Sequence, residues 1–346
     1  MSSSLASLVR GRAPEGHVVL LPDFFIDHVV KVHHDFSAFV HKLKSLVQSG
    51  GGIYFETIQQ ITYGGNAANT AVALAALGVK TVLITTVSKL AKMVLEHFAK
   101  KLPQLDLSHV KFHDRESLTV ALELEEMGKR VNVLLTDPSS IVRFSPDMLT
   151  EDDYETMKEA KLVGVFNWNQ NKRGTKLASI VFRKAKALNP NVKTYLDPGD
   201  PSIKPLTDIK RLIRKVFSPE VLDHLSVNAK EAYAYAKVIN PKQARKRRPL
   251  QNAKVISKTT GVEVNLHTER MAYVVKEDEV VSEPAFSVRE VRRLTGAGDA
   301  WNAGNIYGLL INLKPAQRLK LANACAALHV QGLEVSIPAV TRLLEG

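Results

Sequence analysis

Short apolar runs alternate with amphipathic stretches along most of the chain. The run HVVLL and three others have the length and apolar content of buried strands. They occupy residues 17–21, 81–85, 162–166 and 193–196. Residues 36–48 instead place Phe36, Val40 and Leu43 on one stripe, so they predict an amphipathic helix that ends at the glycines 50–52. The alternation predicts a mostly parallel α/β sheet with helices on both faces.

Two segments break this alternation and predict a second, smaller sheet. Residues 53–63 alternate polar positions with β-branched and aromatic ones, and residues 121–135 contain the hairpin sequence EEMGKR. We expect this sheet to be half exposed beside the main one, either as a lid over a cleft or as a plain sheet edge. Residues 1–16 resemble a loose tail, so one domain is expected over residues 17–346.

The composition indicates a globular protein. The 346 residues are 45% hydrophobic and 24% charged, which disfavours a disordered or fibrous chain. The longest apolar stretch, residues 70–87, is interrupted by Gly78 and Lys80, so it predicts a buried helix and strand and no membrane span. The single cysteine, Cys325, cannot form an internal disulfide, and residues 1–16 lack the apolar core of a signal peptide. We expect a cytoplasmic protein.

The net charge of +12 favours anionic partners such as nucleotides, sugar phosphates or nucleic acid. The densest basic run, KQARKRR at residues 242–248, contains no aromatic residue. A solvated surface loop is therefore the favoured interpretation of this run, and a nucleic-acid patch is the alternative.

The sequence TGAGD at residues 295–299 is the strongest chemical motif. Small residues precede an expected helix, whose first amide groups lack internal partners and can hold a phosphate. Trp301 occupies the position of the third glycine in a dinucleotide fingerprint, and no Lys-Ser/Thr pair completes a Walker A loop. We expect a phosphoryl group on the amides of residues 296–298, with Asp299 facing the attacking hydroxyl. The structural alternative is that Asp299 is only a helix-start residue in a tight turn.

The sequence GGNAAN at residues 64–69 opens an apolar helix that is expected to be buried. Asn66 and Asn69 lie three positions apart, on one face of its first turn. Amides beside a Gly-Gly turn suit close contact with a polyol, whereas a pair of N-cap residues is the structural alternative.

Three further sets of polar residues remain ambiguous. Asn228 and Glu231 form either a capping box or a site where a carboxylate orders a Mg²⁺-bound water. Asp27, with Asp23 nearby, is expected at the end of the first strand, where α/β sheets bind ligands and where vicinal hydroxyls could be held. The structural alternative is that Asp27 is only a solvated residue at the end of a strand. Asp197, Asp200, Asn167, Asn169, Asn171, Lys172 and Arg173 also follow strands, as weaker candidates. Thr150 and Asp153 predict a helix cap.

These motifs together resemble a known family of enzymes. Residues 64–69 with Gly78 resemble the N-terminal signature of PfkB/ribokinase kinases, and residues 295–304 resemble their C-terminal signature. Asn228 and Glu231 resemble the family's Asn-x-x-Glu magnesium motif. The order and spacing agree from about residue 18 to 340.

The resemblance implies a Rossmann-like sheet flanked by helices, with a small β lid. It implies a kinase that uses Mg²⁺ and ATP or ADP to phosphorylate a sugar-like hydroxyl. It implies Asp299 as the base, Gly296, Ala297 and Gly298 as the anion hole, Asp27, Gly64, Gly65 and Asn69 at the substrate, Asn228, Thr268 and Asn323 at the nucleotide, and Glu231 near the metal through water.

The sequence departs from the family pattern on the nucleotide side. Arg293 and Leu294 replace the usual Asp-Thr pair before TGAGD, and residues 266–270 replace the usual glycine-containing turn. The donor, ATP or ADP, therefore stays open.

The acceptor also stays open. A neutral sugar or nucleoside would be held by Asp27 and Asn69. A sugar phosphate such as ribose 1-phosphate or fructose 6-phosphate is the alternative, motivated by the net charge and by Lys172 and Arg173. A nucleic-acid-binding protein using residues 242–248 and a catalytically inactive regulator are rival hypotheses, of which nucleic acid is disfavoured. A homodimer paired through the lids stays open too.

Overall fold

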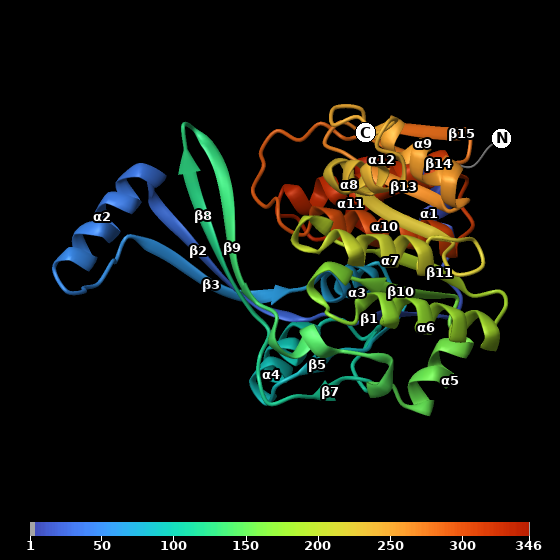
Figure 1. Cartoon of the computed structure of the whole chain (residues 1–346), viewed down its shortest axis with the longest axis horizontal. Helices are drawn as coiled ribbons and strands as arrows, with labels where there is room; N and C mark the ends of the chain where they lie inside the picture. Colours follow the sequence, from blue (N-terminus) through green and yellow to red (C-terminus); the bar gives the residue numbers. More distant parts are fainter. Residues whose placement is uncertain (1–3, 346) are drawn as a thin grey trace.

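The computed structural model of the chain describes residues 4–345, apart from the side chains of residues 129 and 130. Within these residues the central sheet has nine strands in the order β15-β14-β13-β12-β11-β10-β1-β4-β6 (Figure 1). Seven neighbouring strands run parallel, and β14 and β15 add an antiparallel edge. The strands are β1 (His17–Leu21), β4 (Lys80–Leu83), β6 (Leu105–Asp106), β10 (Leu162–Phe166), β11 (Lys193–Asp197), β12 (His224–Asn228), β13 (Glu263–His267), β14 (Met271–Lys276) and β15 (Glu279–Pro284).

Helices cover both faces of this sheet, as the alternating pattern predicts. In β1, Val19 and Leu21 pack into one apolar core, while Val18 and Leu20 pack into the other. The first core is covered by α5 (Glu151–Glu159), α6 (Gly174–Leu188), α7 (Leu206–Val216), α8 (Ala229–Ile239) and α9 (Pro249–Thr260). The second is covered by α1 (Leu5–Gly11), α3 (Asn66–Ala76), α4 (Lys89–Ala99), α10 (Ala297–Leu310), α11 (Pro315–Val330) and α12 (Ile337–Glu345).

The lid is a separate four-stranded sheet in the order β3-β2-β8-β9. Its strands are β2 (Phe25–Asp35), β3 (Thr57–Gly64), β8 (Leu118–Glu126) and β9 (Lys129–Asp137). The β8–β9 turn matches the predicted hairpin, since Met127 and Gly128 both have positive φ, at 50° and 70°. Figure 1 shows this sheet projecting from the body, with α2 (Phe36–Gln48) near its far end.

Smaller elements connect these parts. A two-stranded parallel ribbon joins β5 (Thr86–Val87) to β7 (Lys111–Phe112). Short 3₁₀ helices are η1 (Ser139–Arg143), η2 (Pro146–Met148), η3 (Trp168–Gln170) and η4 (Pro201–Ile203). No helix among the described residues has the length and apolar character needed to cross a bilayer.

Three expectations need correction. Part of the expected loose tail forms α1, because Ala6 and Val9 are buried in the fold. The lid strand expected from residue 53 starts only at Thr57, and β2, which pairs with it, was not expected. Asp27 therefore lies on the lid strand β2 and not at the end of β1, which is followed instead by Asp23.

Candidate active site

Asp23 organises the start of α3 at the carboxyl end of β1. Its carboxylate accepts hydrogen bonds from the backbone amides of Asn66 at 2.7 Å and Ala67 at 2.9 Å. It also accepts one from Nδ2 of Asn167, which follows β10, at 2.9 Å. The side chain is fully buried, and this burial raises its pKa. Asp23 is therefore a structural anchor that joins β1, α3 and the end of β10.

A direct hydrogen bond joins the two glycine-rich motifs. Asn69 of α3 donates through Nδ2 to Oδ2 of Asp299 in α10, at 2.8 Å, although the two residues are 230 positions apart. The other amide atom, Oδ1 of Asn69, is buried and has no hydrogen-bond partner among the described residues. A buried polar atom of this kind is costly unless a ligand satisfies it. Asp299 therefore places a carboxylate beside the Oδ1 atom of Asn69, which is still able to accept a hydrogen bond.

The Asp299 carboxyl is almost buried, at 7% exposure. Burial is the main cause that raises its pKa well above the usual range, and the nearby charges of Asp197 and Asp23 act in the same direction. The hydrogen bond from Asn69 and the charge of Arg293 oppose that rise. A carboxylate with a raised pKa is a stronger base once it is ionised, which suits proton transfer from a hydroxyl.

A second polar network supports the α10 side of the site. Nδ2 of Asn302 donates to Asp197 at 2.6 Å, and Oδ1 of Asn302 accepts from Tyr195 at 2.8 Å and from Ser226 at 2.6 Å. Tyr195 and Asp197 belong to β11, Ser226 belongs to β12, and Asn302 lies on the first turns of α10. Because Asn302 follows Asp299 by one helical turn, the network fixes the rotation of α10 and thereby the direction of Asp299.

The expected anion hole lies at the start of α10. Gly296 has a φ of 86°, a backbone conformation that residues with a side chain rarely adopt. A Cβ added there would also lie only 3.0 Å from the ring of His329, so both the backbone and the packing favour glycine. The amide of Ala297 donates to the carbonyl of Leu294 at 3.2 Å. Of the three expected amides, that of Ala297 is therefore occupied within the chain, and anion binding here stays a prediction.

The lid brings Asp27 close to the glycine pair. A Cβ added to Gly64 would lie 2.1 Å from Oδ2 of Asp27, so only glycine leaves room for this carboxylate. Burial raises the pKa of Asp27 to about 6, while a hydrogen bond from Thr119 and the charge of Arg293 oppose the rise. Asp27, Gly64 and the start of α3 at Gly65 thus meet, as the substrate-site hypothesis requires.

Arg293 is a cation that the motif analysis did not place in the site. Its charge acts on the carboxyls of both Asp27 and Asp299, and on the neighbouring His329, whose pKa is lowered mainly by burial. The departure of Arg293 from the family pattern was the one sequence signal that pointed to this position.

Asn228 and Glu231 form a capping box at the start of α8. The backbone amide and Nδ2 of Asn228 donate to the two carboxylate oxygens of Glu231, at 2.9 and 2.7 Å. Burial first, and then the charge of Asp197, raises the pKa of Glu231 to about 8. No group of three acidic, histidine or cysteine side chains among residues 4–345 could cage a metal ion. A contact of Glu231 with Mg²⁺ through water therefore stays a prediction.

The expected nucleotide residues surround an aromatic pair. His267 at the end of β13 stacks on Trp301, with ring centroids 5.0 Å apart and planes 29° apart. Nε1 of Trp301 donates to Oδ1 of Asn323 at 2.9 Å, and Nδ2 of Asn323 donates to the carbonyl of Pro284 at 2.9 Å. Oγ1 of Thr268 donates to the carbonyl of Met271 at 2.8 Å. Nucleotide contacts by these side chains therefore stay predictions.

His267 carries no charge near neutral pH. Burial lowers its pKa to about 4. A Cβ added to Gly298 would lie 3.4 Å from the imidazole, so the neutral ring borders the expected anion hole. Sequence patterns identified His267 only as a replacement in a glycine turn and could not show this stack.

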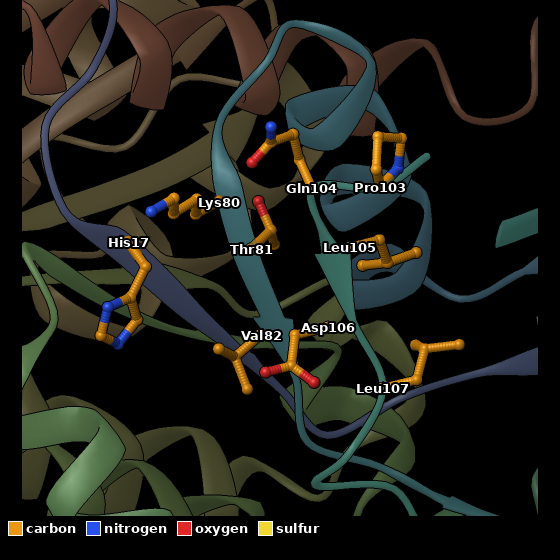
Figure 2. Close-up of a pocket in the computed structure, with 9 residues that line it drawn as sticks. All are labelled: His17, Lys80, Thr81, Val82, Pro103, Gln104, Leu105, Asp106 and Leu107. Carbon is orange, nitrogen blue, oxygen red and sulfur yellow. The ribbon is translucent and has the colours of Figure 1, made fainter. Parts of the chain in front are cut away.

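One cavity lies away from Asp299 and Asn69. It has a volume of about 530 Å³ and is lined by residues that include His17, Lys80 and Asp106 (Figure 2). His17 and Lys80 are the first residues of β1 and β4, so this cavity is at the amino ends of the strands. In parallel α/β sheets the ligand site is at the opposite, carboxyl ends, where Asp299 and Asn69 meet.

Comparisons with known proteins agree with this arrangement. The family model described as pfkB family carbohydrate kinase matches residues 28–342. Arabidopsis thaliana ribokinase, solved with ribose and ATP, is 18% identical with a TM-score of 0.71, covering 97% of this chain and 100% of its own. Thermotoga maritima ribokinase is 18% identical with a TM-score of 0.69, covering 96% and 100%. Adenosine kinase from Sinorhizobium meliloti is 17% identical with a TM-score of 0.69, covering 96% and 99%.

No curated protein matches the sequence. The structural likeness, at identities this low, establishes the fold, and the family model extends over most of the chain. The predicted Rossmann-like sheet with flanking helices and a β lid is confirmed. The chain belongs to the pfkB family of carbohydrate kinases and is a phosphotransferase with a hydroxyl acceptor.

Proposed function

We propose that the chain transfers a phosphoryl group from ATP or ADP to a hydroxyl of a sugar or nucleoside, with Asp299 as the base. The observation that carries this proposal is the 2.8 Å hydrogen bond between Asn69 and Asp299, beside the unpartnered Oδ1 of Asn69. Asn69 orients the carboxylate, and its free oxygen can accept a hydrogen bond from the acceptor. The two motifs thus define one position for a reacting hydroxyl.

Asp299 would take the proton of the attacking hydroxyl as the phosphoryl group arrives. The transition state of phosphoryl transfer is loose, so positioning and charge neutralisation contribute more than early deprotonation. Gly296 and Gly298 lie at the positive end of α10, and their amides would face the transferring oxygens. The third expected amide, of Ala297, would first have to leave the carbonyl of Leu294.

The donor would lie over His267, Trp301 and the turn at Thr268. Mg²⁺, carried by the donor phosphates and by water ordered through Glu231, would neutralise phosphate charge. The Arabidopsis thaliana ribokinase, solved with ATP, and a ribokinase from Cryptococcus neoformans, solved with ADP, support a nucleotide donor, and they leave the choice between the two nucleotides open. A cytoplasmic location belongs to the same proposal, whereas the oligomeric state stays open.

The neutral acceptor is favoured by the lid. Asp27 lies against Gly64, and a carboxylate can accept hydrogen bonds from two vicinal hydroxyls. The ribose in the Arabidopsis thaliana ribokinase complex supports a sugar, and the Sinorhizobium meliloti adenosine kinase supports a nucleoside. The specific observation that favours a phosphorylated acceptor instead is Arg293, whose charge acts on both Asp27 and Asp299.

A phosphotransfer screen tests both candidates. Purified chain is assayed with ATP and with ADP against sugars, nucleosides and sugar phosphates, and the Arg293→Ala variant is assayed in parallel. We expect turnover with a neutral acceptor and a KM for it that changes less than about threefold in the variant, since a lost charge-assisted contact costs about tenfold or more. A phosphorylated acceptor whose KM rises about tenfold or more would select the second candidate. Absence of transfer with every pair would contradict the proposed function.

A further inference from the structure

A second cavity lies between the starts of α6 and α7, and basic side chains dominate its wall. It has a volume of about 160 Å³, and its lining includes five cations. These are Lys172, Arg173, Lys176, Lys204 and Arg211. Neither Asp27, Asn69 nor Asp299 lines it, so the cavity is separate from the proposed transfer centre. The sequence analysis singled out Lys172 and Arg173 as possible contacts for an acceptor phosphate, and the structure places them here instead.

The charges of this wall are not balanced inside the protein. Asp147 pairs with Arg173 at 3.4 Å and with Lys176 at 3.0 Å, and Asp208 pairs with Arg211 at 3.0 Å. Among the described residues, no carboxylate lies within ion-pair distance of Lys172 or Lys204. The five cations of the lining therefore have two carboxylate partners, of which only Asp208 lines the cavity itself.

Lys204 is held in place by the fold. Its Nζ donates to the carbonyl of Asn171 at 2.7 Å and lies 5.2 Å from the ring centroid of Trp168. Burial, together with the charge of Lys172, lowers the pKa of Lys204, and Asp208 opposes that shift. A half-buried ammonium beside a second cation is an unfavourable arrangement that a bound anion would relieve.

The backbone and the ring of Trp168 complete the cavity. The 15-residue helix α6 begins at Gly174 without a side-chain cap, and the positive end of its dipole lies here. The amide of Gly174 donates to the carbonyl of Asn171 at 3.2 Å, so the amides of Thr175 and Lys176 are those left to bind an anion. Trp168 lines the cavity although it is only 1% exposed, and its Nε1 donates to Thr175 at 2.8 Å. The ring is therefore a fixed inner wall.

We propose that this cavity binds a phosphate or diphosphate group of a small metabolite, at a site distinct from the phosphoryl-transfer centre. Arginine and lysine around a helix start match a compact anion with several charged oxygens. The volume is below the roughly 300–1,000 Å³ of pockets that enclose drug-sized ligands, so it suits a phosphate group and not a whole nucleotide.

Tryptophan fluorescence provides a direct test with inorganic pyrophosphate as the probe. The chain contains two tryptophans, so a Trp301→Phe variant leaves Trp168 as the only reporter. Pyrophosphate is titrated to about 10 mM at constant ionic strength, a range that detects dissociation constants near 1 mM. We expect a saturable change in Trp168 emission. If Trp301→Phe does not fold, broadening of the ³¹P signal of pyrophosphate is used instead to measure binding to the chain that keeps Trp301.

Charge variants locate the binding. In Lys172→Gln/Lys204→Gln the dissociation constant should rise at least about tenfold, because two charge-assisted contacts are lost. Lys172→Gln/Lys176→Gln alters only exposed side chains and repeats the test if the first variant unfolds. Lys246→Gln/Arg247→Gln removes the same charge from a distant loop and should leave binding unchanged.

Either of two results with pyrophosphate would overturn the proposal. One is no saturable signal with pyrophosphate. The other is an equal dissociation constant in the cavity variants and in Lys246→Gln/Arg247→Gln, which would place pyrophosphate at the start of α10 or make it a general charge effect. Citrate is titrated as a carboxylate control, and binding of citrate as tight as that of pyrophosphate would refute a phosphate site.

Discussion

At the scale of single residues, the site is a set of carboxyls kept from water by their neighbours. Asp23 and Asp197 are each held by amide donors, and Asp299 is held by Asn69. Each of these bonds favours the ionised form, while burial and the mutual repulsion of the carboxylates favour the protonated form. At Asp197 the effect of burial is the larger one, because it raises the pKa of this carboxyl to about 6.

These shifts predict an acid limb in the pH profile. A carboxyl with a raised pKa takes up its proton earlier on acidification, so Asp27 loses its charge as the pH falls through about 6. Asp299 is shifted in the same direction. We therefore expect kcat/KM to fall with a midpoint at or above about pH 6, measured from about pH 5 to 8.5. Constant kcat/KM down to pH 5 would contradict the combination of a raised pKa and an ionised carboxylate in the reaction.

At the scale of elements, local signals in the sequence predicted most boundaries. The helix expected over residues 36–48 is α2, and the capping expected at Thr150 and Asp153 is present at α5. These features depend on neighbours a few positions apart, so pattern and capping rules are sufficient to find them.

Features that depend on distant residues were not predictable in this way. β2 was missed because Pro22 and Asp23 interrupt the apolar run, and its pairing with β8 joins segments about 90 positions apart. The role of Asn302 depends on Tyr195, Ser226 and Asp197, which come from two different strands. The sequence motifs identified Asp299 and Asn69 as candidates, but only the fold shows that their side chains form a hydrogen bond.

One hydrogen bond connects the lid to the anion-hole segment, and we expect it to affect binding of the acceptor. Nδ2 of Asn132 in β9 donates to Oγ1 of Thr295, at the start of the anion-hole segment, at 2.9 Å. Asn132→Ala removes this bond, and since such a bond contributes about 1 kcal/mol, we expect the acceptor KM to rise about three- to tenfold with little change in kcat. Asn191→Ala, in an exposed loop before β11, is the matched control. Equal KM values for both variants and the native chain would show that the lid does not depend on this contact.

At the scale of the whole molecule, the densest basic run of the chain forms an ordered, mostly exposed loop. In the run at residues 242–248, Arg245 turns back to donate to the carbonyls of Lys242 and Ala244, each at 2.8 Å. Its backbone amide donates to Asn252 at 2.8 Å. The run is therefore a folded surface loop, in agreement with the favoured interpretation.

A gel shift tests the nucleic-acid alternative. We expect no retained complex with duplex DNA or RNA at about 0.15 M salt, where exposed charges are screened beyond about 8 Å. The variant Lys246→Gln/Arg247→Gln should behave as the native chain does, in the gel and in phosphotransfer. A complex that persists at this salt, falls steeply with further salt and disappears in the variant would support nucleic-acid binding.

The central claim is that Asp299 takes the proton of the acceptor hydroxyl, and the Asp299→Asn variant tests it most directly. Steady-state kcat and nucleotide affinity are measured beside Asp278→Asn, a control in which the carboxyl is 83% exposed. We expect kcat of Asp299→Asn to fall about 10²–10⁴-fold with nucleotide affinity within about threefold, and the control to match the native chain. A kcat near the native value in Asp299→Asn would contradict the account.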